Sequence, residues 1–209
     1  ATQDEIVQVI EGSSSDIVAY SVLCLTYREL WAYAAQDSQD FRVLSTVVQR
    51  AKKMDPISEY AGVCEVVEAA LRGKWETAEA LTETWLQQKP LPAFYEIRGE
   101  IAFNHHENEL ARRYYQTTQT VEGQWLKPMV QEARAATELQ QFPEAYEIYK
   151  KVLRKNPKHG IALIELGILE SLQFRQDQKA IDLIQTALNL PNKIPRDVLS
   201  RGHLEFARI

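Results

Sequence analysis

Apolar residues recur along this chain at helical spacing, in segments separated by short polar turns. In the segment 144–156 the positions i, i+3, i+4, i+7 and i+8 are occupied by Ala145, Ile148, Tyr149, Val152 and Leu153. That spacing places the five side chains on one buried face of a helix. Pro143 suits the first turn of this helix, and Asn156-Pro157 ends it, because proline disfavours α geometry in the residue before it.

A second segment, 75–90, repeats this frame with different residues. Its apolar stripe consists of Ala78, Leu81, Trp85 and Leu86. The stretch Leu71-Arg72-Gly73 precedes it and predicts a turn between two helices. Segments 75–90 and 142–157 each open with an aromatic residue, Trp75 or Phe142, and close with a proline fifteen positions later. The chain therefore contains the same helical sequence pattern more than once.

Several residue types recur together at a period close to 34 residues. Prolines 56 and 90 are 34 apart, as are prolines 157 and 191, and Phe41 and Trp75. Small residues recur at Gly99, Ala133, Gly167 and Gly202, and alanines at Ala78, Ala111, Ala145 and Ala180. Series that advance in parallel at one period indicate an internal repeat.

Each period predicts two antiparallel helices. Gly99, Ala133 and Gly167 lie midway along first helices, and the alanine series lies early in second helices. Two helices approach most closely where the side chains are smallest, so these positions are expected to be in contact. The aromatic residues Phe41, Trp75 and Phe142 are expected to fill the wedge beside each turn. The predicted fold class is all-α.

This pattern resembles the tetratricopeptide repeat, which implies a right-handed superhelical solenoid of antiparallel helix pairs. The resemblance covers five units, at 25–56, 59–90, 92–123, 126–157 and 160–191. The second unit lacks the small residue of its first helix, the third has Asn108 instead of the aromatic residue, and the fifth has an extra residue in QFRQDQ. Residues 1–24 are expected to form an N-terminal helical cap, with a helix start near Ser15-Asp16.

Residues 192–209 are expected to form a C-terminal helix, which is either a cap or the start of a sixth unit, because Gly202 is in register with Gly167. Leu204, Phe206 and Ile209 would leave an apolar ending on it. A solenoid exposes an apolar face at each end unless something covers it. We therefore expect a chain cut from a longer protein, or an end that docks onto another domain or a second copy; the first residue, Ala1, also fits a processed or truncated chain.

Composition argues against several other classes of protein. The formal net charge is −5 with no long Lys/Arg run, which disfavours a nucleic-acid partner. The mean hydropathy is −0.34, and no apolar run approaches the ~20 residues of a membrane helix. Cys24 and Cys64 form no disulfide framework or metal pattern, so two buried thiols and a reducing, cytoplasmic setting are expected.

Candidate chemistry is sparse. His105-His106, followed by Glu107 and Glu109, is the one metal-like cluster, but adjacent histidines point different ways on a helix, and the pair falls where the third unit should turn. We therefore expect His105-His106 to lie in a solvated turn. We find no glycine loop for phosphates and no nucleophile motif. The sequence predicts a protein without catalytic activity, cofactor or metal.

The resemblance implies a groove lined by the first helices, which would bind a partner protein or peptide. The residues expected to line it are Glu29, Tyr33, Gln36, Tyr60, Val63, Cys64, Val67, Glu96, Glu100, Phe103, Asn104, Lys127, Val130, Arg134, Glu138, Ile161, Ile164, Glu165 and Ile168. Because only Lys127 and Arg134 are basic, no clamp for a C-terminal carboxylate is expected, and an amphipathic helix or a basic segment fits better. The alternative is a structural or self-assembly module that docks through its terminal faces onto another domain of a larger protein or onto a second copy, as a homodimer.

Overall fold

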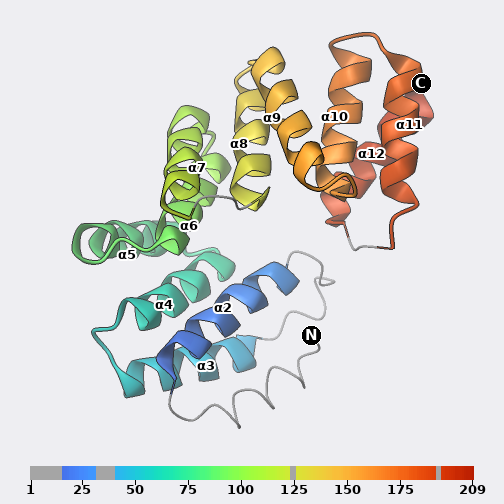
Figure 1. Cartoon of the computed structure of the whole chain (residues 1–209). Coiled ribbons are helices and arrows are strands. Elements are labelled where there is room, and N and C mark those ends of the chain that lie inside the picture. Colours follow the sequence, from blue (N-terminus) through green and yellow to red (C-terminus); the bar gives the residue numbers. More distant parts are fainter. Residues whose placement is uncertain (1–15, 32–40, 123–125, 192–193) are drawn as a thin grey trace. The chain divides into compact units, whose positions relative to one another are not determined.

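The computed structural model describes residues 16–31, 41–122, 126–191 and 194–209 (Figure 1). Regular structure within these ranges is α-helical. The helices are α2 (Ile17–Trp31), α3 (Phe41–Met54), α4 (Glu59–Leu71), α5 (Trp75–Gln88), α6 (Pro92–Asn104), α7 (Asn108–Glu122), α8 (Leu126–Glu138), α9 (Phe142–Lys155), α10 (Gly160–Leu172), α11 (Asp177–Leu188) and α12 (Arg196–Arg208). They form two compact units, residues 1–101 and 102–209, which divide inside α6.

Helices α4, α6, α8 and α10 begin at residues 59, 92, 126 and 160, where the sequence places the starts of units two to five. The predicted boundary between the N-terminal cap and the first unit, at residues 24 and 25, does not coincide with a helix start, because α2 runs through both residues. The Oδ1 atom of Asp16 accepts a hydrogen bond of 2.9 Å from the N–H of Val18, as an N-cap does. Of the residues expected in the groove, Tyr33 and Gln36 lie outside the described ranges.

The described turns that join the two helices of a helical hairpin share one backbone feature. A single residue takes a left-handed conformation in each of four turns, with φ of +70° at Gly73, 62° at His106, 59° at Gln140 and 57° at Arg175. The next N–H then donates back to the first helix, for example from Gln141 to the carbonyl of Ala136 at 2.9 Å. His105-His106 is therefore an exposed turn, as predicted. The extra residue of the fifth unit lengthens its turn, where Gln176 donates to Glu170 at 2.8 Å.

Small residues mark the close approaches between paired helices. A Cβ added to Gly167 would lie 2.7 Å from Cγ1 of Ile184 and 3.2 Å from the carbonyl oxygen of Ala180, so the predicted contact between these two small residues exists. In the second hairpin the close approach occurs at Gly62 instead, where an added Cβ would overlap the indole of Trp85. In this hairpin the small residue of α4 therefore contacts an indole instead of an alanine, and it lies earlier in the helix than the 34-residue period predicts.

Unit 1 contains a disulfide that the sequence did not predict. Cys24 of α2 and Cys64 of α4 are fully buried and bonded to each other, with a Cα–Cα distance of 5.4 Å. The prediction of two separate thiols is therefore wrong, because packing of α2 against α4 joins residues that lie 40 positions apart. The inference from free cysteines to a reducing compartment loses its basis.

Aromatic side chains belong mainly to the cores, as their stripe positions predict. Trp85 is 9% exposed and lies parallel to Phe94 in unit 1, with ring centroids 6.0 Å apart. Tyr115 and Tyr149 are buried in unit 2. Burial raises the pKa of Tyr149 well above its ordinary value. These rings stabilise the stacked helices and are not available as surface platforms for bases.

Candidate functional site

We call the surfaces formed by α2, α4 and α6 in unit 1, and by the end of α6 with α8, α10 and α12 in unit 2, the first-helix surfaces. Some residues expected there are core residues instead. Four valine and isoleucine side chains are at most 3% exposed, namely Val63, Val67, Val130 and Ile164. Cys64 is held in the disulfide. Side chains this buried cannot contact a partner, and we leave them out of the candidate site.

In unit 1, two expected groove carboxylates belong to an internal ion-pair cluster. The Nη2 atom of Arg28 on α2 lies 2.6 Å from Oε1 of Glu96 and 2.6 Å from Oε1 of Glu100 on α6. Burial alone would lower the pKa of Arg28, but the charges of Glu100 and Glu96 outweigh it and raise that pKa. These carboxylates therefore tie α2 to α6. Of the other expected residues in this unit, Glu29 is exposed and Tyr60 half-buried.

In unit 2, three expected residues come together with two that the sequence did not single out. Arg134 on α8 lies 3.6 Å from Glu165 on α10 and 3.6 Å from Asp197 on α12. Nη1 of Arg201 donates to Oε2 of Glu165 at 3.2 Å. The guanidinium of Arg134 also lies over the ring of Phe103, 5.5 Å from its centroid. We call these five residues the Arg134 cluster.

The Arg134 cluster is open to solvent along one side. The side chain of Glu165 is 5% exposed, whereas those of Arg134, Arg201 and Asp197 are 24%, 41% and 63% exposed. One buried carboxylate therefore orients two guanidinium groups that still reach solvent. The register of Gly202 with Gly167 was the available signal for Asp197 and Arg201, because it places α12 beside α10 and these two residues one turn apart.

The other expected residues of unit 2 differ in how far they are exposed. Lys127, Ile161 and Ile168 are half-buried, as is Phe103, while Asn104 and Glu138 are exposed. The surface therefore mixes apolar side chains with polar ones. Such a mixture suits contact with a polypeptide better than catalysis, which would need a closed and desolvated site.

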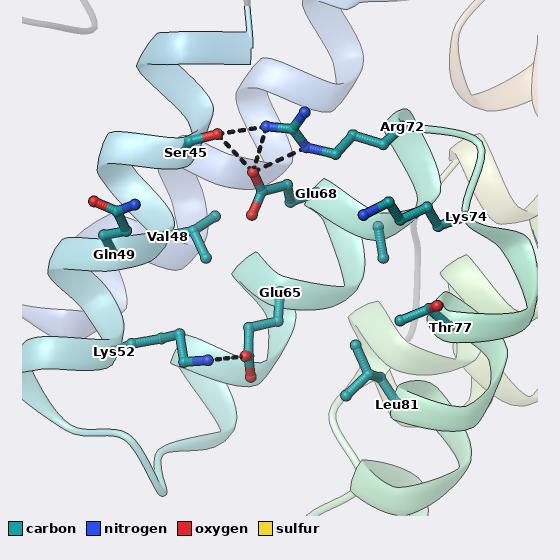
Figure 2. Close-up of a pocket in the computed structure, with 11 residues that line it drawn as sticks. Ser45, Val48, Gln49, Lys52, Glu65, Glu68, Arg72, Lys74, Thr77 and Leu81 are labelled. Carbon is teal, nitrogen blue, oxygen red and sulfur yellow. Dashed lines mark hydrogen bonds and ion pairs between the residues drawn. The ribbon is translucent and has the colours of Figure 1, made fainter.

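Unit 1 also contains a groove that the sequence did not predict, with a volume of about 470 Å³ (Figure 2). It lies between α3 and α5, and α4 forms its floor. Each helix contributes a stripe at helical spacing: Ser45, Val48, Gln49 and Lys52; Glu65, Glu68, Ala69 and Arg72; and Lys74, Thr77 and Leu81 around the start of α5. The signal existed in the i, i+3, i+4, i+7 pattern of the first two stripes, but it needs the packing of three helices to become a groove.

Ion pairs border this groove, which we call the α3–α5 groove. Nη2 of Arg72 lies 2.9 Å from Oε1 of Glu68 and donates to Oγ of Ser45 at 2.7 Å, and Ser45 donates to Glu68 at 2.6 Å. Lys52 pairs with Glu65 at the other end (Figure 2). Val48 and Ala69 are 4% and 7% exposed and provide an apolar floor. The groove therefore has charged rims and an apolar base.

At the C-terminal end, α12 leaves apolar side chains in solvent. Leu204 is 72% and Phe206 38% exposed, while Ile209 is half-buried. The helix itself is docked, because Nη2 of Arg208 donates to Oγ of Ser171 on α10 at 2.6 Å. Exposed leucine and phenylalanine on a fixed helix form a candidate contact surface.

Within the part of the chain that the structure describes, no three His, Cys, Asp or Glu side chains are grouped to hold a metal ion. The same residues include no helix with the length and hydropathy needed to cross a bilayer. His159 has a structural role, because its Nδ1 accepts a hydrogen bond of 3.3 Å from the N–H of Ala162 at the start of α10.

These helix pairs, their left-handed turns and their small-residue contacts define a helical-repeat protein with the tetratricopeptide fold, and comparison with known structures confirms this fold class. YrrB, a tetratricopeptide-repeat protein with an unusual peptide-binding site, superposes with a TM-score of 0.59 at 15% identity, over 99% of this chain and 98% of its own. Yeast Tom70 gives 0.70 at 17% identity over 99% of this chain and 43% of its own, and human IFIT1, in a dimer with PPP-AAAA, gives 0.76 at 12% identity over 99% and 49%.

No protein-family model matches the chain. Among curated proteins, the mitochondrial import receptor subunit TOM70 of Rattus norvegicus and of Mus musculus are both 34% identical over 77 residues. The match covers 36% of this chain but only 12% of each relative. At these identities and coverages the comparisons show the fold. Solenoids of this class present extended surfaces on which proteins assemble.

Proposed function

We propose that this chain is a non-catalytic scaffold that binds a segment of a partner protein on the first-helix surface of unit 2. The observation that carries the proposal is the Arg134 cluster, where two partly exposed guanidinium groups flank Glu165 and that of Arg134 lies over the ring of Phe103. Arginine and aromatic side chains are enriched at protein interfaces, and such pairs supply much of the binding energy.

The chemistry of this surface favours an amphipathic helix as the partner segment. Half-buried Phe103, Ile161 and Ile168 can contact an apolar stripe, while Arg134 and Arg201 can bind carboxylates beside it. A purely basic segment fits less well, since Glu165 already pairs with both arginines, and Glu96 and Glu100 pair with Arg28. The partner class is therefore a protein with an acidic amphipathic segment.

Affinity capture with crosslinking and mass spectrometry tests this proposal. Arg134→Glu should reduce partner capture at least tenfold, because it removes one guanidinium and sets two carboxylates together. Arg154→Glu is the matched control, since Arg154 is an exposed arginine at the end of α9, outside the cluster. Circular dichroism should show equal helix content in both variants. Equal capture by wild type and Arg134→Glu, or crosslinks that avoid α8, α10 and α12, would reject the proposed surface.

A second candidate function is docking through the C-terminal face onto another domain or a second copy. Its support is the exposure of Leu204 and Phe206 on the docked helix α12. The double variant Leu204→Glu/Phe206→Glu should lower the mass measured by light scattering, or release a docked domain in a longer chain. Ala207→Glu, at an exposed position of the same helix, is the control for added charge. A monomeric wild type whose contacts do not change in the double variant would exclude this function.

A further inference from the structure

We propose that the α3–α5 groove of unit 1 is a second and separate binding site, for a short acidic peptide segment that inserts an apolar side chain. It lies on the side of the hairpins where the second helices α3 and α5 run, and it shares no residue with the Arg134 cluster. The inference therefore goes beyond the proposed function and can fail or succeed independently of it.

The size and shape of the groove suit a peptide. Its volume of about 470 Å³ falls within the ~300–1,000 Å³ of typical ligand sites. Two of the helix stripes that line it run from Ser45 to Lys52 and from Glu65 to Arg72, each about 10 Å long at a rise of about 1.5 Å per residue. A trough of that length accommodates two or three residues of an extended chain.

The floor of the groove selects an apolar side chain. Val48 and Ala69 are buried below it, and Leu81 is half-buried at its edge. Thr77 stands exposed at the opening. Covering this apolar floor with a leucine-like side chain removes nonpolar surface from water, which is the main favourable contribution to binding.

The charges at the rim select carboxylates on either side of that side chain. Lys52 and Arg72 are each paired with a glutamate of α4, so the two carboxylates of the groove are already neutralised. Lys74 adds a third cation, and no hydrogen bond or ion pair of its side chain is found among the described residues. The lining thus carries three cations against two anions in a protein whose net charge is −5. This local excess of positive charge complements an acidic segment.

Fluorescence anisotropy with three labelled hexapeptides tests the site. The first has two leucines flanked on each side by two glutamates, the second replaces the glutamates with lysines, and the third replaces the leucines with serines. We expect only the first to bind. Binding of the lysine peptide with equal affinity would reject the charge argument. Equal binding of the serine peptide would show attraction of anions alone and would also reject the site. Failure of the first peptide to bind wild-type protein overturns the proposal.

Two pairs of variants locate the peptide. Lys74→Glu should weaken binding about tenfold, whereas Lys53→Glu, an exposed lysine outside the lining, should leave it unchanged. Thr77→Trp should block the groove, whereas Thr84→Trp, an exposed threonine later in the same helix, should not. Arg134→Glu should also leave peptide binding intact, which separates this site from the one in unit 2. Unchanged binding in both Lys74→Glu and Thr77→Trp would place the peptide elsewhere and overturn the inference.

Discussion

At the scale of single residues, the turns inside the hairpins concentrate backbone strain. Gln140 adopts φ 59° in an exposed position, a conformation that costs a residue with a side chain about 1 kcal/mol and costs glycine little. Gly73 fills the equivalent position with the residue that suits it. Replacing Gln140 with glycine would relieve this cost. Glycine also gains conformational freedom in the unfolded chain, which offsets part of the gain in stability.

Gln140→Gly should therefore raise the free energy of unfolding by about 0.5–1 kcal/mol. Glu138→Gly is the matched control, since it lies two residues earlier in the last turn of α8, where glycine should cost about 0.5–1 kcal/mol. Urea unfolding followed by circular dichroism measures both. The prediction fails if the two glycine substitutions change stability in the same direction.

The cap at His159 gives one local pH dependence. Burial lowers the pKa of His159 below its ordinary 6.5, and the neutral Nδ1 accepts the N–H of Ala162. A folded-state pKa below the unfolded one means that the unfolded chain binds the proton more readily. The cap contributes ~1 kcal/mol to the free energy of unfolding, the usual size for an N-cap. This contribution is complete above about pH 6.5 and is lost as the pH falls through the folded-state pKa of His159.

His159→Asn should remove this dependence, because asparagine caps a helix without titrating. The measured quantity is the difference in unfolding free energy between wild type and variant, from urea titrations at pH 8, 6.5 and 5. We expect the wild type to lose stability relative to the variant as the pH falls. A difference that is constant across these pH values would assign the cap no role in titration.

For individual side chains, the sequence predicted the position on a helix but not the burial. The positions of Val63, Val67, Val130 and Ile164 on first helices were readable from the period, but their burial was not. A helix of a repeat contacts its own partner and both neighbouring repeats, so more than one of its faces is covered. The Cys24–Cys64 pair was missed because its two halves belong to different repeats and no local spacing connects them.

At the scale of the helix, the repeat period predicted most of what is observed. The starts of α4, α6, α8 and α10 and the contact of Gly167 with Ala180 follow from prolines and small residues read at 34-residue steps. The second unit lacks a small residue at the expected site, and Gly62, three positions earlier, makes the close contact instead. It could not be identified from the period because its partner is the ring of Trp85, whose reach along α4 depends on a side-chain rotamer.

A double-mutant cycle tests this local substitution of one contact for another. Gly62→Ala should destabilise unit 1 by about 1–3 kcal/mol, because the added methyl group overlaps the indole of Trp85. In a Trp85→Ala background the same change should become stabilising by about 1 kcal/mol, since only the helix propensity of alanine remains. Thermal and urea unfolding of the four proteins measure the cycle. A destabilising effect of Gly62→Ala in both backgrounds would show that the contact is not with Trp85.

At the scale of the whole molecule, the chain divides into two units that carry different candidate sites. The α3–α5 groove belongs to unit 1, and the Arg134 cluster and the exposed end of α12 belong to unit 2. The fold class could be predicted from the repeats, but neither the α3–α5 groove nor the complete Arg134 cluster could, because the groove requires side chains from three helices and the cluster from four. A scaffold of this kind can bind different segments through separate units.

The disulfide gives a test of how independent the two units are. It lies wholly within unit 1, where it closes a separation of 40 residues between α2 and α4. A cross-link of this span stabilises mainly by restricting the unfolded chain, typically by about 2–4 kcal/mol. In a repeat array stability is approximately a sum of local contributions from each repeat and its neighbours, so the loss on reduction should stay near the bond.

Hydrogen–deuterium exchange of the oxidised protein and of the Cys24→Ser/Cys64→Ser variant measures this directly. Peptides from α2 and α4 should exchange faster in the variant, since opening of these helices becomes easier, whereas peptides from α10 and α11 should keep their rates. Thiol titration of the wild type under denaturing conditions provides the control, because it should detect no free thiol before reduction. If exchange rose equally in both units, the chain would unfold as a single cooperative body, and the two candidate sites could not be treated as independent.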